Sequence, residues 1–370
     1  MRKSALYAFG LVVAALVALG FVILFSASEK NGIKYGDDPY FFVKRQAVYL
    51  AIGIVLVVAL SLFDYHKWRE WAALPWLFYI AVAVMLGLVF LFPKINGSHR
   101  WIDLGSFRAQ PSELAKIATV VLVAAWMDRS AWKVELFKRG ALCPALIIAL
   151  PAALILAEPD FGSFMVLCAA GFLVMFVAGT KITHLGLFIL TGVAAGVLLL
   201  VNNPNRMARL FGGSDTVQHQ ARMALVAFKN GGLFGQGLGQ SIQKEYYLPE
   251  AHTDFIFAIG AEELGLVYTI ATILMFSLFF ALAVYIARKA SDRFGRFLVI
   301  GMAFLIFFQA MFNLGVVCKA LPTKGMALPF FSYGGTNLMT SFFAVGTILS
   351  VGIHSWRDRN RRFTARVLAR

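Results

Sequence analysis

The sequence predicts an all-α polytopic membrane protein, organised as a single multi-pass membrane domain over residues 1–370. The chain is 60% hydrophobic and only 14% charged, and its mean hydropathy is +0.75. These values lie outside the range of soluble globular proteins. Long apolar runs also recur along the whole chain, each close to the ~20 residues that a helix needs to cross a bilayer.

About ten membrane-spanning helices are expected. The first apolar run follows a basic start, as in a signal peptide, but it is too long for one and predicts an uncleaved first helix. Apolar windows of about 17 to 25 residues lie at 6–26, 45–63, 73–92, 111–127, 141–157, 162–179, 183–201, 256–287, 297–317 and 335–353.

The net charge of +15 is distributed in a way that places both termini in the cytoplasm. Basic residues gather at the N-terminus, in alternate links between the apolar runs and in the tail "RDRNRR", in agreement with the positive-inside rule. These cations suit membrane lipids with anionic headgroups. Nucleic-acid binding is not expected, because no basic domain exists to carry it.

Four segments on the opposite, external side carry most of the unusual chemistry. They are "KINGSHRWIDLGSFRAQPSE", "EPDFG", the long connection 202–255 between the seventh and eighth predicted spans, and "CKALPTKGMALPFFSYGG". A connection of about 50 residues is far above the usual loop length and is expected to be functional. In the last segment, prolines and glycines interrupt an apolar stretch and predict a re-entrant loop.

The long connection contains two recognisable parts. Its middle, "HQARMALVAFKNGG", predicts an amphipathic helix on the bilayer surface, with Arg222 and Lys229 towards the headgroups. The Gly-rich run "GGLFGQGLGQS" lacks the spacing of a dinucleotide fingerprint. It predicts a tight, bent backbone beside the membrane instead.

Two ionisable residues inside an apolar helix predict a polar cavity. Glu113 and Lys116 lie three residues apart in "QPSELAKIATVVLV", and a buried ammonium costs roughly 2.5–3.5 kcal/mol on insertion scales, so Lys116 needs a partner. A purely structural ion pair is the alternative. Further basic residues favour a cationic pocket suited to phosphate or pyrophosphate, namely Arg100, Arg108, Lys319 and Lys324.

Two aspartates stand at the starts of predicted helices. Asp160 in "EPDFGS" and Asp254 in "LPEAHTDF" can each serve as a helix N-cap. Asp254 is also at the wet end of its helix, where a reacting group could reach it. Glu262 and Glu263 lie about 80° and 180° round the helix from Asp254, so they are expected to face away from it as packing or cavity-lining groups.

Five motifs together resemble the SEDS family of shape, elongation, division and sporulation proteins. They are "NGSHRWIDLG", "QPSELAK", "EPDFGS", "GLGQSIQKEYYLPEAHTDFIFAIGAEELG" and "LPTKGMALPFFSYGG", and they cover nearly the whole chain in the expected order. The last loop looks like the "LPTKGLTLP" of the cell-division member rather than the "LPVTGIPLP" of the elongation member. One departure is Thr336-Asn337, where the family usually has two serines.

The resemblance implies a peptidoglycan glycosyltransferase that polymerises lipid II on the outer face of the bacterial plasma membrane during septal wall synthesis. It also implies that the protein acts together with a class B penicillin-binding protein and with other membrane proteins of the division machinery. The family's essential aspartate matches Asp254, which would accept the proton of the acceptor hydroxyl. The expected substrate-binding residues are Arg100, Arg108, Glu113, Lys116, Asp160, Lys319, Lys324 and Ser332.

Several alternatives stay open at this point. No cofactor is certain, but a Mg²⁺ or Mn²⁺ ion could bridge Asp254 and the pyrophosphate, since both ions prefer oxygen ligands. A transporter or flippase for a lipid-linked precursor would also need many helices and a cationic cavity. A non-catalytic scaffold of the division machinery is the third function, and it would not need Asp254.

Overall fold

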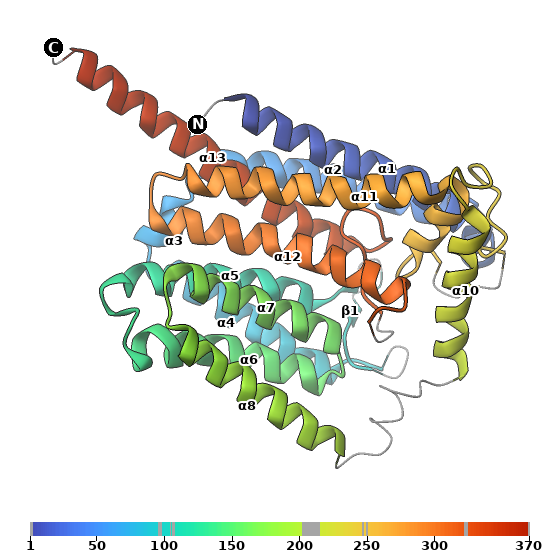
Figure 1. Ribbon diagram of the computed structural model, residues 1–370, viewed down its shortest axis with the longest axis horizontal. Helices are drawn as coiled ribbons and strands as arrows, with labels where there is room; N and C mark the ends of the chain where they lie inside the picture. Colours follow the sequence, from blue (N-terminus) through green and yellow to red (C-terminus); the bar gives the residue numbers. More distant parts are fainter. Residues whose placement is uncertain are drawn as a thin grey trace.

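The computed structural model describes residues 3–94, 98–103, 105, 108–201, 215–245, 248, 251–321 and 325–368. Long helices pack side by side along one direction, and α1 begins and α13 ends at the same end of this bundle (Figure 1). The other end, which we call the loop end, carries the connections at 98–103, 108–110, 158–160, 251–255 and 325–334.

Each of the ten predicted spans coincides with a long helix. Eight helices in the described part of the chain are long and apolar enough to cross a membrane; α5 and α8 are the two that do not meet this measure. The ten helices are α1 (Lys3–Gly36), α2 (Phe41–Leu62), α4 (Ala73–Leu88), α5 (Pro111–Arg129), α6 (Cys143–Ala157), α7 (Phe161–Ala178), α8 (Ile182–Val201), α11 (Ile256–Arg288), α12 (Arg293–Val317) and α13 (Gly335–Leu368).

Shorter elements complete the described chain. Strands β1 (Ile102–Asp103) and β2 (Arg108–Ala109) pair antiparallel at the loop end, with Ile102 opposite Ala109. Helix α3 (His66–Glu70) lies at the opposite end. Single helical turns occupy Val89–Leu91, Ala131–Lys133 and Phe137–Leu142.

Helix α5 is the buried centre of one half of the bundle. It packs against α4, α6, α7 and α12, and nearly all of its side chains are buried. Small residues such as Ala118 and Ala125 let the neighbouring helices approach closely. The position of α5 therefore places Glu113 and Lys116 in the protein interior.

Helix α10 (Asp215–Gly231) lies across the loop end, at a large angle to the spanning helices (Figure 1). Its buried face, which includes Ala224 and Ala227, packs against α11, whereas Arg222 and Lys229 are exposed. The predicted amphipathic helix is therefore confirmed. Contact of its two cations with headgroups stays a prediction.

Helix α11 is broken at Gly265, where φ is 72° and ψ is −161°, and the Gly-rich run fills the break. The amides of Leu266 and Val267 donate to the carbonyls of Gly232 and Leu233, at 3.0 and 3.3 Å. In return, the amides of Gln236 and Gly237 donate to the carbonyls of Glu262 and Glu263, at 3.0 and 2.9 Å. The predicted bent backbone is confirmed, and it supplies the hydrogen bonds that the broken helix loses.

Gly235→Ala is expected to destabilise the protein more than Gly239→Ala. Both glycines have a φ of 81°, a conformation that costs a non-glycine residue about 1–3 kcal/mol, but only at Gly235 would a Cβ collide with the backbone of Glu263. A thermal unfolding scan of each variant in the same detergent measures the difference. Equal melting temperatures for the two variants would show that the close backbone contact between Gly235 and Glu263 does not stabilise the broken helix.

An ion-pair cluster joins the links at the end opposite to the loop end. The His66 ring lies 2.6 Å from Asp64 through Nδ1 and 3.1 Å from Asp292 through Nε2, and Arg69 pairs with Asp128 of α5 at 2.8 Å. The hydrogen bond to Asp292 raises the pKa of His66 to about 9 against the opposing effect of burial, and Asp64 adds to the rise.

The stability of the protein is therefore expected to fall as the pH rises through about 9. The folded-state pKa of His66, about 9, lies above the value of about 6.5 in an unfolded chain, so this contribution is fully present below pH ~6.5 and is lost above the folded pKa. Melting temperatures between pH 6.5 and 9.5 test this, and His66→Gln should flatten the decline. His219→Gln, on the exposed face of α10, is the control; the same decline in His66→Gln as in the parent would contradict the assignment.

Candidate functional site

Segments that are distant in sequence meet at the loop end through hydrogen bonds. The amide of Gln110 donates to Thr336 Oγ1 at 3.2 Å, and Ser332 Oγ donates to the carbonyl of Thr253 at 2.6 Å. The guanidinium of Arg100 donates to the carbonyl of Glu158 at 3.3 Å. The four segments predicted to carry the chemistry therefore converge on one region.

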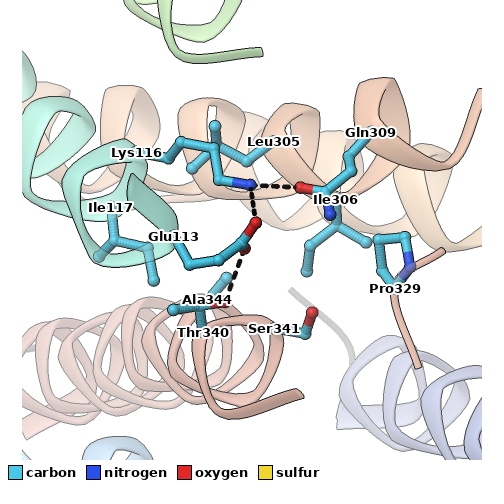
Figure 2. A pocket seen from close by; sticks show the side chains of 10 residues that line it. All are labelled: Glu113, Lys116, Ile117, Leu305, Ile306, Gln309, Pro329, Thr340, Ser341 and Ala344. Carbon is cyan, nitrogen blue, oxygen red and sulfur yellow. Dashed lines mark hydrogen bonds and ion pairs between the residues drawn. The ribbon is translucent and has the colours of Figure 1, made fainter. Parts of the chain in front are cut away.

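The Glu113–Lys116 pair is present and buried. Lys116 Nζ lies 2.8 Å from Glu113 Oε1, with 4% and 8% of the two side chains exposed. Lys116 also donates to Gln309 Oε1 at 2.6 Å, and Thr340 donates to Glu113 Oε2 at 3.3 Å (Figure 2). The predicted partner of the buried ammonium is therefore confirmed, and a second partner, Gln309, comes from α12.

A small cavity lies beside this ion pair. Its walls include Leu305, Pro329 and Ser341 together with the pair itself (Figure 2). The volume of about 20 Å³ has room for about one water molecule, and neither a sugar nor a pyrophosphate would fit. Both members of the pair therefore line a space of water size.

Asp254 lies in the turn before α11, half-buried at the loop end. Its carboxylate oxygen Oδ2 occupies the space that a Cβ on Gly325 would fill, so the glycine leaves room for this side chain. The expected N-cap role of Asp254 is wrong, because α11 begins at Ile256 and its N-cap position is Phe255, which makes no side-chain cap. Asp254 therefore lies one residue before the N-cap position.

Asp160 caps its helix as predicted. Its Oδ1 accepts from the amide of Ser163 at 3.1 Å, and its Oδ2 accepts from the side chains of Gln110 and Ser112 at 3.1 and 3.4 Å. Ser332 is also occupied within the protein, because its hydroxyl accepts from the amide of Leu328 at 2.7 Å. Substrate binding by Asp160 and Ser332 stays a prediction.

The predicted cations differ in how much they are exposed. The Arg108 side chain is 62% exposed and pairs with Asp103 at 2.9 Å, and Lys319 is exposed after the end of α12. Arg100, in contrast, is half-buried and holds the turn at Glu158 and Pro159. Lys324 lies outside the described residues.

Glu158, whose backbone carbonyl accepts from Arg100, is fully buried. Neither of its carboxylate oxygens has a hydrogen-bond partner in the described part of the chain. Burial raises the pKa of Glu158 to about 8, with Asp160 contributing to the rise and Arg100 opposing it. Burial therefore favours the neutral form of this carboxyl group.

Glu262 and Glu263 hold the segment that follows α10. Both are fully buried. Glu263 accepts from Ser26 at 2.5 Å and Lys244 at 3.1 Å, and Glu262 accepts from Asn230 at 2.9 Å. The prediction that Glu262 and Glu263 face away from Asp254 and serve as packing groups is confirmed.

The model for the FtsW, RodA and SpoVE family of cell cycle proteins matches residues 7–356. The chain belongs to this family. A probable peptidoglycan glycosyltransferase FtsW from Trichlorobacter lovleyi is 39% identical over 355 residues, which cover 92% of this chain and 91% of the relative. The stage V sporulation protein E of Bacillus subtilis is 36% identical over 351 residues, covering 92% and 94%.

Solved structures of this family share the fold. A chain of a peptidoglycan synthase complex, described for its coordination of polymerization and crosslinking, has a TM-score of 0.77 at 27% identity and covers 95% of this chain and 98% of its own. The rod shape determining protein RodA of Thermus thermophilus has a TM-score of 0.70 at 28% identity, covering 95% and 97%. The chain is therefore a multi-pass membrane protein of the FtsW, RodA and SpoVE family.

Two site residues of this family member escaped the sequence analysis. Asn313 of α12 donates to the backbone carbonyls of Asp254 and Met326, at 2.9 and 2.6 Å. Gln309, one turn earlier, donates to the carbonyl of Ala327 at 3.0 Å. Two amide side chains four residues apart in "FFQAMFNLG" lie on one face of an apolar helix, and this is the signal that could have identified them.

A double-mutant cycle on Glu113→Gln and Lys116→Met is expected to show strong coupling. Removing one partner of a buried ion pair costs about 3–5 kcal/mol, because the other charge is left uncompensated. The double variant should lose less than the two single losses together, by about 0.5–3 kcal/mol. Unfolding free energies in mixed detergent micelles measure the cycle, and additive losses would show that the two side chains do not act as a pair.

Proposed function

We propose that the chain is a peptidoglycan glycosyltransferase that polymerises lipid II into glycan strands. The observation that carries the proposal is the position of Asp254, a half-buried carboxylate that lies against Gly325 of the last loop, where the loops converge. Relatives named as probable peptidoglycan glycosyltransferases, at 36–39% identity over most of the chain, support the same reaction class.

The reaction needs a base and a group that stabilises the leaving anion. The acceptor sugar hydroxyl attacks the anomeric carbon of the donor, the bond from that carbon to the lipid pyrophosphate breaks, and the configuration inverts. Asp254 accepts the hydroxyl proton. Asn313 fixes the backbone of Asp254 through its carbonyl, and such positioning matters because a carboxylate is only a weak base.

The pyrophosphate is assigned to the exposed cations of the loop end. Arg108 and Lys319 both reach solvent at the loop end, and an Arg guanidinium binds phosphate oxygens in a bidentate way. Lys324, which the sequence also predicts for this role, lies outside the described residues. Lys116 acts through another residue, because it holds Gln309, which in turn holds the last loop at Ala327.

A divalent ion is an alternative to direct stabilisation by cations. Asp254 would be the candidate protein ligand, and the pyrophosphate oxygens of the substrate would supply further hard ligands for Mg²⁺ or Mn²⁺. Among the described residues, no group of three or more His, Cys, Asp or Glu side chains could hold an ion.

The cellular setting is part of the proposal. Relatives named FtsW support a role in septal wall synthesis at the plasma membrane, with the loop end on the outer face. The match to a chain of a peptidoglycan synthase complex supports a class B penicillin-binding protein as the partner that crosslinks the new strand. Other membrane proteins of the division machinery are proposed as further partners.

Asp254→Asn is expected to reduce polymer formation from labelled lipid II by about 10²–10⁴-fold, because the positioned base is lost. The measurement is a gel of glycan products made by purified protein in detergent. Glu245→Gln, at an exposed carboxylate of the same end paired with Lys30, is the matched control and should keep its activity.

Three outcomes separate the candidate functions. Full-length polymer from Asp254→Asn would overturn the assignment of the base. Movement of lipid II across vesicles without any polymer would favour the flippase. Normal growth of cells that carry only Asp254→Ala would favour the scaffold.

A further inference from the structure

The segment that follows α10 has polar side chains inside and apolar side chains outside. Ser241 and Gln243 are 2% and 6% exposed, whereas Leu238 and Ile242 are 52% and 50% exposed. A segment that faces water shows the opposite arrangement, because burial favours apolar side chains. The outer surface of this segment therefore suits an apolar environment.

The same surface continues onto the exposed face of α11. Leu266 and Val267 are 45% and 56% exposed, and their amides are hydrogen-bonded to Gly232 and Leu233. Leu233 is itself 63% exposed. The Gly-rich run is thus hydrogen-bonded to α11 at residues whose side chains are about half exposed.

Helix geometry gives the depth of this junction in the bilayer. Val267 precedes Arg288, the last residue of α11, by 21 residues, which corresponds to about 32 Å of helix. The hydrocarbon layer is about 30 Å thick, and Arg288 and Lys289 mark one of its edges. Leu233 and its neighbour Phe234, which is 81% exposed, are therefore level with the opposite edge.

The charges of the segment fit this depth. Within residues 230–244, all of which the structure describes, the one charged residue is Lys244. Its ammonium is turned inwards to Glu263 at 3.1 Å, with 6% of the side chain exposed. The segment exposes no charge, and the amides of Gln236 and Gly237 are bonded to carbonyls of α11. Both features lower the cost of contact with the apolar edge of a bilayer.

We infer that Leu233, Phe234, Leu238 and Ile242 form an apolar wedge that inserts among the lipid acyl chains at the loop-end edge of the bilayer. The wedge is bonded to α11 on both sides of Gly265, so it sets the depth of the short helical part that follows Asp254. This inference does not depend on which reaction the site performs.

Nitroxide labelling of the full chain in lipid nanodiscs tests the wedge. The three cysteines are first replaced, and single labels are then placed by Phe234→Cys and Leu238→Cys. Collisions with oxygen, which partitions into acyl chains, and with a water-soluble nickel chelate are measured for each label. Leu274→Cys, 61% exposed in mid-span of α11, is the lipid reference, and Glu135→Cys, with 81% of its side chain exposed, is the aqueous reference.

The ratio of oxygen to nickel collisions at positions 234 and 238 is expected to lie close to that at 274 and well above that at 135. A ratio equal to that at 135 would place the surface in water and overturn the inference. Low accessibility to both reagents in nanodiscs that hold one copy of the chain would show that protein covers the surface, which would also overturn it. A melting temperature within the range of the reference variants confirms that the labelled chains are folded.

Discussion

The ammonium of Lys116 in the interior of the bundle is the constraint on which the loop end depends. A charge at that depth must be compensated within the protein, and it is held by Glu113 of its own helix and Gln309 of α12. Glu113 is held in turn by Asn337 and Thr340 of α13. One buried charge therefore fixes three helices relative to one another.

The same contacts extend from the ion pair to the candidate base. Gln309 and Asn313 lie one turn apart on α12 and bind successive carbonyls of the last loop, at Ala327 and Met326, while Asn313 also binds the carbonyl of Asp254. A buried ion pair is weak evidence for stability, because its desolvation cost can exceed its Coulombic gain. Its retention here is better explained by the loop geometry that it determines.

Prediction from the sequence succeeded where a local rule applied. The apolar windows gave the ten long helices, and the cost of a buried ammonium identified Glu113 as the partner of Lys116, three residues away. The glycines of the run 231–239 predicted a bent backbone, because glycine tolerates a positive φ. Several of them do adopt a positive φ in the structure. The break at Gly265 was not predicted, since a single glycine inside a helical pattern is compatible with an unbroken helix.

Contacts between distant segments were beyond these rules. Lys116 and Gln309 are separated by 193 residues, and no spacing in the sequence relates them. The N-cap prediction for Asp254 failed for a different reason, because sequence patterns place a helix end only to within a few residues, and α11 has its N-cap position at Phe255, one residue later. Local patterns give the elements, whereas the long-range polar contacts give the site.

The effect of the departure from the family motif at Thr336-Asn337 can be judged from such long-range contacts. Thr336 Oγ1 accepts from the amide of Gln110 and donates to the carbonyl of Arg108, both at 3.2 Å, and a serine hydroxyl has the same capacity. Asn337 donates to Glu113 at 3.3 Å, as a hydroxyl at that position also could. The two substitutions keep the donors that the buried pair and the loop require, so the departure alters the packing around the site more than its chemistry.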